Sequence, residues 1–479
     1  LLTTLFRAFL YYLISFHLKS VGKTTSNAIF QYIVNYEYEK FITTSKKEIK
    51  NTITYRLNAV IHGIHTTTIT ILHSAISLPF FMVAISTLIG KEVIYIFITL
   101  ILILIFTYSK YKKFIAHSNK VADQSNGNIL ELVSNMITDP RSLKIYDLEN
   151  VFAKNFSSND SELRNTQATN ILFTILPRTL AEVFIYVSAF LVLLISNDNN
   201  VSNVFVLGPI LLVTLARVIP LLTNLNTNFI IFKANHVALS TILEYKRKIK
   251  EKPHLVIKKY AKLESIDLIN YKKIIYYYPN KKKATLSINN LTLKKGFPLI
   301  ITGASGMGKS TLLDVMCGLL SSNSIQIDAR LNKTNKVLDK YYLKQNSSYC
   351  GQTNFLIPGT VEDNLMIGEV GKIKKDFIYS LLREFGLSEF NLKDVVNDGK
   401  DLVSGGQKQR INIIRCLIEK RKILFMDEPS SALDKKNTNI LIRLINKYTK
   451  NKLVGIVSHD LQAFSQIKNG RIFDLDKLL

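Results

Sequence analysis

Two long stretches without a charged side chain dominate the first half of the sequence. Residues 57–90 contain no Asp, Glu, Lys or Arg, and residues 93–109 form a second such run, bounded by Glu92 and Lys110. Because an α-helix rises about 1.5 Å per residue, each run is long enough to cross a hydrocarbon core about 30 Å thick. Both runs therefore predict membrane-spanning helices, and the second half of the chain has no comparable run.

The first half is predicted to be an all-α transmembrane domain covering residues 1–244. The expected spans, about five, lie near residues 1–18, 64–89, 93–110, 170–196 and 203–230. Arg178, Glu182 and Arg217 interrupt the last two, for which a buried helix of a soluble domain is the alternative. The long loops between spans are rich in Lys and Arg, and such loops stay on the cytoplasmic side. The sequence thus predicts a multi-pass protein of a bacterial inner membrane, with its C-terminal half in the cytoplasm.

The overall charge is strongly positive. The net charge of +26, from 62 Lys and Arg against 36 Asp and Glu, suggests nucleic acid or an anionic membrane surface as a partner. Because the basic residues accompany predicted spans, we expect the lipid bilayer and no nucleic acid. The cysteines, Cys317, Cys350 and Cys416, have no ligand-type spacing, which excludes a disulfide scaffold. The charged segment 245–262 predicts a linker to a second domain at 263–479.

The second domain alternates short β-branched runs with helical stretches. The expected strands are LIIT at 299–302, SIQI at 324–327, ILFM at 423–426 and LVGIV at 453–457. Such alternation is typical of a parallel sheet covered by helices. The sequence therefore predicts a multidomain chain in which an α/β nucleotide-binding domain follows the helical one.

A glycine-rich segment, GASGMGKS at 303–310, joins an expected strand to an expected helix, as a phosphate-binding loop (P-loop) requires. Its glycines allow backbone N–H groups to face phosphates, and the helix N-terminus favours negative charge. Lys309 is expected to reach the β- and γ-phosphates of ATP, and the Ser310 hydroxyl to bind Mg²⁺. The residues expected to bind the nucleotide are those of this segment and the one after it: Gly303, Ala304, Ser305, Gly306, Met307, Gly308, Lys309, Ser310 and Thr311.

An acidic pair follows the apolar run of KILFMDEPSSALD at 422–434. Asp427, at the end of the expected strand, would deliver a carboxylate to the Mg²⁺ ion. Glu428, the next residue, is placed to orient or deprotonate the attacking water. A helix cap or a turn would also explain an acidic pair, but it would not explain the P-loop upstream.

The segment LVSGGQKQRINIIRCLIEK at 402–420 resembles the signature of the ABC (ATP-binding cassette) ATPases. In that family the signature of one subunit contacts the ATP bound to the P-loop of the other. The resemblance therefore implies an α/β P-loop ATPase that works as a homodimer or as a paired half-transporter. The signature residues that it places on a partner's nucleotide are Ser404, Gly405, Gly406 and Gln407.

Other residues resemble further elements of the cassette. Tyr278 resembles the aromatic residue that stacks on adenine, with Tyr276 as the alternative. Gln352 resembles the glutamine that senses Mg²⁺ and water, and Asp434 the residue that links the two sites across the dimer. His459 resembles the histidine that holds the γ-phosphate. The resemblance thus implies catalysis by Glu428, His459 and Lys309, and a Mg²⁺ site of Ser310, Gln352 and Asp427.

The sequence departs from the family pattern at two points. Val403 stands where leucine is usual in the signature, a small change in volume that we expect to be tolerated. The segment SSNSIQID also lacks the usual glycine before its strand, which puts only a turn in doubt.

A single cassette after membrane spans resembles the half-transporter exporters, whose subunits have six spans. Because five are predicted here and the chain begins at Leu1 within a predicted span, we expect the first span to be missing. Segments 36–42 and 139–147 are expected to be the coupling helices, with solvated loop tips as the alternative. The function implied is ATP-driven export or flipping of an unknown substrate, such as a lipid, a lipid-linked saccharide or a polysaccharide. A peptide or drug exporter and a non-transporting membrane regulator are the alternatives.

Two arginines bear on the substrate, because Arg178 and Arg217 both fall toward the inner half of the predicted bilayer. Arg178 can instead pair with Glu182 one helical turn away, whereas Arg217 has no partner nearby in the sequence. We hypothesise a positive cavity that faces an anionic headgroup. Replacing both arginines with alanine is then expected to abolish substrate-stimulated ATPase activity and to spare basal hydrolysis; unchanged stimulation would contradict the hypothesis.

Three histidines, His62, His65 and His73, share a Thr-rich stretch at helical spacing. They predict the polar wall of a cavity, with a metal site as the alternative.

A nucleic-acid-acting ABC ATPase would explain the basic charge but not the membrane half. An importer is disfavoured because its cassette is usually a separate chain.

Overall fold

The chain folds into two compact units in a computed structural model. The structure describes residues 2–89, 92–195, 220–221, 223–251, 266–278, 284–320, 325–328, 339–368, 374–397 and 403–478. The helical unit comprises Leu1–Tyr36 and Lys40–Val256. The α/β unit comprises Glu37–Glu39 and Ile257–Leu479.

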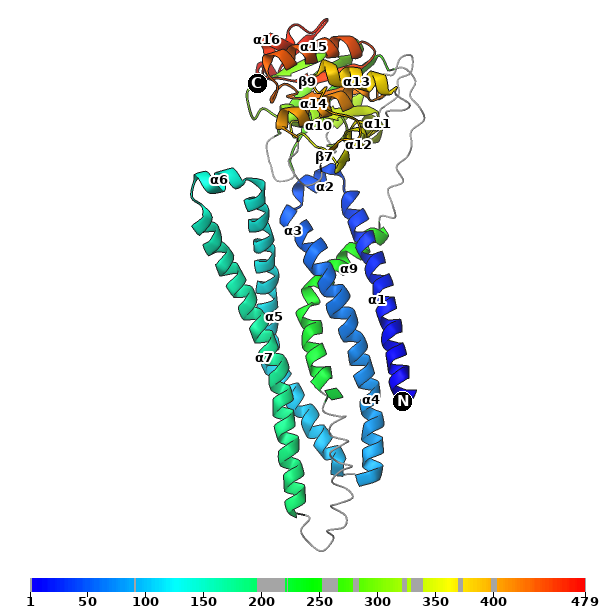
Figure 1. The fold of residues 1–479 in the computed structure, drawn as a ribbon, viewed down its shortest axis with the longest axis vertical. Coiled ribbons are helices and arrows are strands. Elements are labelled where there is room, and N and C mark those ends of the chain that lie inside the picture. The colour runs from blue at the N-terminus through cyan, green and yellow to red at the C-terminus, as the bar shows by residue number, and fades with distance from the viewer. Residues whose placement is uncertain are drawn as a thin grey trace. The chain divides into compact units, whose positions relative to one another are not determined.

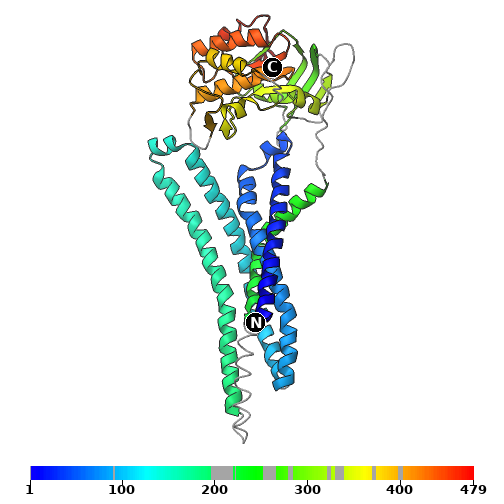
Figure 2. The same cartoon turned by 45° about the vertical axis from the view of Figure 1, so that its right-hand side comes forward.

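The helical unit is built from long helices and short connecting ones (Figure 1). Its helices are α1 (Leu2–Val34), α3 (Lys46–Asn51), α4 (His65–Ile89), α5 (Glu92–Thr138), α6 (Pro140–Ile145), α7 (Glu149–Ile195) and α9 (His236–Glu251), with π-helical turns η1 (Thr52–Arg56) and η2 (Ala59–Ile64). A short helix, α2 (Tyr38–Thr43), has residues in both units. Helices α5 and α7 pack along each other and run side by side in Figures 1 and 2. Of the segments predicted as coupling helices, 36–42 covers most of α2 and 139–147 contains α6.

The predicted spans lie mainly in α1, α4, α5 and α7. In the described part of the chain, however, no helix combines the length and the apolar character needed to cross a membrane. The five spans are therefore not confirmed. Most of the span predicted at 203–230, with Arg217, lies outside the described residues, as does the side chain of Arg178.

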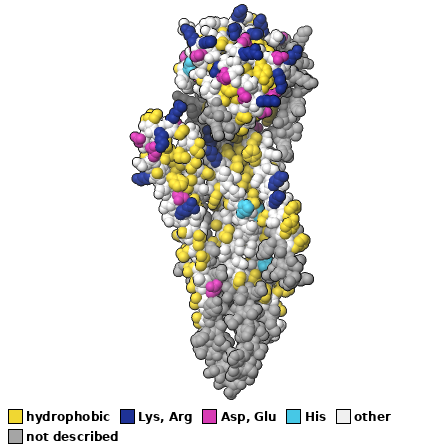
Figure 3. Space-filling model, viewed as in Figure 1, with side chains coloured by type: hydrophobic (Ala, Val, Ile, Leu, Met, Phe, Trp, Pro, Cys, Tyr) yellow, Lys and Arg dark blue, Asp and Glu magenta, His cyan; other side chains and the backbone are white. Residues whose placement is uncertain are grey.

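Many large hydrophobic side chains on the helices of this unit are exposed. Figure 3 shows hydrophobic side chains on one face of the molecule. Examples from the four longest helices are Phe16, Leu72, Phe80, Leu102 and Val183. Exposed apolar side chains that gather on a surface are typical of regions that contact a partner or a membrane. The helical unit therefore offers apolar side chains to something other than its own core.

The beginning of the predicted linker is helical and belongs to α9, which continues to Glu251. This helix has an apolar face, not predicted from the sequence, on which Ile242 and Tyr245 are buried. Two ion pairs one turn apart, Glu244 with Lys248 and Arg247 with Glu251, also stabilise this segment. Residues 252–262 of the predicted linker lie outside the described part.

The α/β unit contains a five-stranded parallel sheet in the order β10-β3-β9-β8-β5. Its strands are β3 (Leu299–Thr302), β5 (Ser347–Cys350), β8 (Ile423–Asp427), β9 (Leu453–Val457) and β10 (Arg471–Asp474). The helices of the unit are α10 (Lys309–Met316), α11 (Lys340–Asn346), α12 (Val361–Leu365), α13 (Lys375–Glu384), α14 (Gly405–Ile418), α15 (Lys435–Tyr448), α16 (Leu461–Phe464) and the 3₁₀ turn η3 (Leu475–Leu478). Strands β8 and β9 are fully buried, as expected for central parallel strands.

The segment SIQI was predicted to join the parallel sheet, and this prediction was wrong. This segment forms β4 (Ile325–Asp328), which pairs antiparallel with β1 (Leu268–Tyr276) in a second sheet of order β2-β1-β4. The third strand of that sheet is β2 (Leu286–Lys294), and β6 (Gly359–Thr360) pairs with β7 (Val395–Asn397) elsewhere. Composition alone predicts a strand but not its partners, because either sheet can bury the same side chains.

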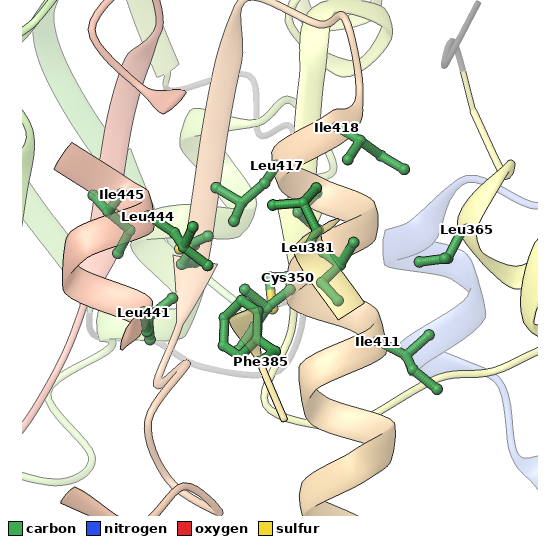
Figure 4. Close-up of a cluster of buried hydrophobic side chains, with 14 of the residues drawn as sticks. Cys350, Leu365, Leu381, Phe385, Ile411, Leu417, Ile418, Leu441, Leu444 and Ile445 are labelled. Atoms are coloured by element: carbon green, nitrogen blue, oxygen red, sulfur yellow. The ribbon is translucent and has the colours of Figure 1, made fainter. Parts of the chain in front are cut away.

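A hydrophobic cluster fixes α13, α14 and α15 around β5 and β8. Figure 4 shows Phe385 and Cys350 beside Leu381 and Leu441, which come from α13 and α15. Phe385 and Leu441 are completely buried, and truncating such a side chain to alanine typically costs about 2–5 kcal/mol. This packing holds α14, whose first turn carries the signature, against the sheet.

Candidate functional site

The P-loop runs from the buried strand β3 into α10, as predicted. Gly303, Gly306 and Gly308 have φ angles of +145°, +85° and +88°, which side chains other than glycine rarely adopt. At Gly308 a Cβ atom would also lie 2.9 Å from Cδ2 of Leu286. Glycine therefore gives this loop both its left-handed turns and its close contact with β2.

The Lys309 side chain lies along the P-loop and is only 6% exposed. Its Nζ donates hydrogen bonds to the carbonyl oxygens of Gly303 at 2.7 Å and Ala304 at 2.9 Å. From η3, both carboxylate oxygens of Asp476 accept the Ala304 N–H, at 3.0 and 3.1 Å. Asp476 was not predicted from the sequence, because no local motif marks a contact between residues so far apart in the chain.

Two of the three Mg²⁺ ligands proposed from sequence, Ser310 and Asp427, lie in contact at the end of β8, and the third, Gln352, contacts the neighbouring Glu428. Asp427 is 4% exposed and accepts hydrogen bonds from the hydroxyls of Ser310 and Tyr349. Burial raises the pKa of the Asp427 carboxyl, and these two hydrogen bonds oppose the rise. Oxygen ligands of this kind suit Mg²⁺, which keeps waters and takes one or two carboxylates together with substrate phosphates. The residues present therefore fit the ion.

Glu428 follows Asp427 in a left-handed conformation, with φ of 49°. Its Oε1 lies 3.1 Å from Nε2 of His459, and its Oε2 accepts a hydrogen bond of 3.4 Å from the Gln352 amide. The two carboxylate oxygens thus contact two other residues predicted from sequence. A cavity of about 590 Å³ opens here, lined in part by Glu428, Ser431, Ser458 and His459.

The structure distinguishes the two tyrosines proposed for adenine. Tyr278 is half-buried, and its hydroxyl lies 3.1 Å from Oγ1 of Thr311 at the start of α10. Tyr276 is completely buried, with its ring 5.1 Å from that of Tyr278. Tyr278 therefore has the accessible ring beside the P-loop, and Tyr276 supports it from within the core.

The signature forms the first turn of α14. Ser404 is the N-cap in a capping box with Gln407, whose side-chain amide also donates to Glu389 at 3.0 Å. A Cβ atom on Gly405 would meet nothing within 4 Å, so this turn is open for a close approach. Among the residues that the structure describes, positions 404–407 make no hydrogen bond to the P-loop of the same chain. Asp434 caps α15 by accepting the Asn437 N–H at 2.7 Å.

A further carboxyl lies beneath the P-loop. Asp314 of α10 accepts hydrogen bonds from the hydroxyls of Tyr38 and Tyr349, and Asp427 is near enough to repel its negative charge. Burial, helped by Asp427, raises the pKa of Asp314 to about 7. No sequence motif singles out Asp314, because its environment comes from residues distant in the chain.

Replacing Asp314 with asparagine is expected to remove a pH dependence of stability. The folded protein keeps the Asp314 proton to about pH 7, whereas the ordinary pKa of an aspartate side chain is 3.8. The resulting stabilisation is present below pH 3.8 and is lost as the pH rises through 7. At pH 8, Asp314→Asn is expected to be more stable by about 2 to 4 kcal/mol, or roughly 5 to 10 °C in Tm. The measurement is thermal unfolding of nucleotide-free protein from pH 5 to 8; a pH-independent difference between variant and parent contradicts it.

The histidine stripe of the helical unit lies in η2 and α4. His62 and His73 are exposed, and His65 is half-buried. Within the described ranges, no three His, Cys, Asp or Glu side chains gather closely enough to hold a metal ion. The metal alternative for this stripe therefore finds no support.

Comparison with known proteins agrees with this geometry. A family model described as "ABC transporter" matches residues 286–431, which contain the P-loop, Gln352, the signature and Glu428. The lipoprotein-releasing system ATP-binding protein LolD of Leptospira interrogans is 33% identical over 199 residues, which make up 39% of this chain and 83% of LolD. The chain belongs to the ABC transporter family, and its α/β unit is an ATP-binding cassette with ATPase chemistry.

Two further proteins resemble more of the chain than the cassette. An ATP-dependent lipid A-core flippase of Pseudoalteromonas atlantica is 22% identical over 375 residues, which cover 74% of this chain and 63% of the flippase. The structure of a bacterial Atm1-family ABC exporter with ATP bound superposes with a TM-score of 0.78 at 14% identity, covering 98% of this chain and 83% of the exporter. The chain therefore has the half-transporter exporter fold, with a helical unit and one cassette.

Proposed function

We propose that this chain is one subunit of a dimeric exporter that uses ATP·Mg²⁺ to move a lipid or a lipid-linked saccharide across a membrane. The observation that carries the proposal is the union, in one chain, of an exporter-type helical unit with a cassette. The 375-residue match to the flippase is longer than residues 257–479, so the likeness extends into the helical unit. A lipid-type substrate agrees with the printed name of that relative.

The outward-facing side chains of the helical unit support a membrane setting. Phe16, Phe80 and Val183 are each more than half exposed and lie on three different long helices. Burying one such side chain in an apolar environment is worth about 1.5–3 kcal/mol. We propose that lipid covers these positions and that the cassette lies on the cytoplasmic side.

The cassette supplies the groups that phosphoryl transfer requires. Lys309 and the P-loop amides would bind the phosphates, and Tyr278 would stack on adenine. Ser310 and Asp427, with Gln352 nearby, would hold the Mg²⁺ ion, which neutralises charge on the phosphates when bound. Glu428 would accept a proton from the attacking water.

Two cassettes would form the complete sites. Ser404 is the N-cap of α14, and Gly405 to Gln407 form its first turn. The N-terminus of a helix favours an anion such as a γ-phosphate. Because this turn makes no hydrogen bond to the P-loop of its own chain in the described part, we propose that it contacts ATP on a partner subunit. His459 would hold the γ-phosphate, and Asp434 would lie at the interface between the subunits.

ATPase stimulation in reconstituted vesicles tests the function. Purified protein in phospholipid vesicles is expected to hydrolyse ATP several-fold faster when an anionic glycolipid is added, and to move a fluorescent phospholipid between leaflets. Glu428→Gln vesicles are the control that should do neither. Stimulation by hydrophobic peptides alone would favour a peptide exporter, and no stimulation by lipid, glycolipid or peptide would favour a regulator.

A further inference from the structure

The buried amide of Gln409 has no role in the chemistry described so far. Gln409 lies in α14, just past the signature turn, and is 1% exposed. Its Nε2 donates to the Glu428 carbonyl oxygen at 3.4 Å and to Oγ of Ser431 at 3.2 Å, while its Oε1 accepts the Ala432 N–H at 3.0 Å. One side chain therefore joins the signature helix to the segment that carries the proposed catalytic base.

The backbone of Glu428 needs such support. A residue other than glycine in the left-handed region typically costs about 1–3 kcal/mol and persists only where its surroundings hold it. The Glu428 N–H donates to the carbonyl oxygen of Val457 in β9 at 3.0 Å, which fixes one side of the residue. Its carbonyl accepts from the Ser431 N–H at 3.1 Å and from Gln409, which fix the other side.

A second contact brings α14 against the same segment. A Cβ atom on Gly406 would lie 3.1 Å from the carbonyl oxygen of Ala432, so the first turn of α14 packs on this backbone. The Gln409 amide lies one turn further along and bonds the neighbouring groups. Through both contacts, the position of α14 determines the position of the loop after Glu428. The orientation of the Glu428 side chain depends on that loop.

We propose that Gln409 is a positioning residue for ATP hydrolysis: its amide holds the Glu428 backbone so that the carboxylate points at the attacking water. The inference rests on the proposed role of Glu428 as the base. Gln409 touches neither the P-loop nor the Tyr278 ring in the contacts above. Its loss should therefore slow the chemical step and leave ATP binding almost unchanged.

Two substitutions test the amide. Gln409→Glu keeps the shape and the acceptor for the Ala432 N–H but replaces the donor to the Glu428 carbonyl, and Gln409→Met removes both functions. We expect kcat of the purified full chain to fall about 10- to 100-fold in each, with KM for ATP changed less than about twofold, since a small misplacement of a catalytic group can cost 10²-fold. Parental kcat in a folded Gln409 variant overturns the proposal.

Thr449→Val is the matched control for loss of a buried polar contact. Thr449 is 3% exposed and donates to the Ile445 carbonyl at the end of α15. This variant is expected to lower Tm and to leave kcat unchanged. A kcat loss as large as that of Gln409→Met would mean that general destabilisation explains both. If neither Gln409 variant folds, Gln409→Asn keeps an amide but shortens the side chain and withdraws it from the Glu428 carbonyl, and parental kcat there also overturns the proposal.

A double substitution separates this inference from the role of Glu428. If Gln409 acts through Glu428, then Gln409→Met should lower kcat no further in a Glu428→Gln background. A full additional loss in that background overturns the positioning role. Parental activity of Glu428→Gln alone would instead overturn the role of Glu428 as the base.

Discussion

Glu428→Gln is expected to reduce steady-state ATP hydrolysis by at least 10²-fold and to leave the protein holding ATP. Glutamine has nearly the same shape and can still place an oxygen beside His459, but it cannot accept a proton from water. General-base catalysis typically contributes 10²- to 10⁴-fold to the rate. The P-loop and Tyr278 are unchanged, so ATP should still bind. Phosphate release measures the rate, and radiolabelled ATP retained after gel filtration measures the trapped nucleotide.

The matched control is Glu384→Gln, the same chemical change at a partly exposed residue of the cassette. Glu384 pairs with Arg443 at 3.5 Å, and such exposed pairs contribute only about 0–1 kcal/mol. Glu384→Gln should therefore hydrolyse ATP within about twofold of the parent. A Glu428→Gln protein that matches the parent in phosphate release would rule out Glu428 as the base.

Local patterns predicted the parts of the cassette that a short segment specifies by itself. The runs LIIT and LVGIV coincide with β3 and β9, because a fully buried parallel strand is apolar throughout. The P-loop could also be predicted from its sequence. Its three glycines are needed where the φ angles are positive, and a lysine begins the helix that follows. In these segments the residues that determine the local structure are neighbours in sequence.

The rest depends on contacts between distant segments. Asp476 reaches the P-loop only because β10 pairs with β3 and places η3 beside Gly303. Gln409 lies within the segment that resembles the signature, yet nothing in the sequence shows that its amide meets Glu428. The same reason explains why the predicted partner strands of β4 were wrong and why the buried face of α9 was not predicted. A short segment does not specify which other segments pack on it.

Lys309→Met is expected to weaken ATP binding and to reduce hydrolysis together, unlike the substitution of Glu428. A charge-assisted hydrogen bond contributes about 1.5–3 kcal/mol, so losing the ammonium should weaken ATP binding by at least 10- to 100-fold. Methionine keeps much of the length and apolar volume of lysine. Titration with a fluorescent ATP analogue measures affinity, and phosphate release measures turnover. Lys295→Met is the control, because Lys295 pairs with Asp267 at 3.3 Å on the surface and should keep parental affinity.

The stability of Lys309→Met decides how its loss of binding is interpreted. Without nucleotide, the Lys309 ammonium is buried against the carbonyl oxygens of Gly303 and Ala304. The Asp427 carboxyl attracts it, but no carboxylate among the described residues forms a close ion pair with it, and burying such a charge is costly. We therefore expect nucleotide-free Lys309→Met to have a Tm equal to or above that of the parent, while ATP raises the Tm of the parent alone. Lost affinity with retained Tm would mean that Lys309 binds phosphate. Parental affinity in Lys309→Met would instead place the nucleotide elsewhere.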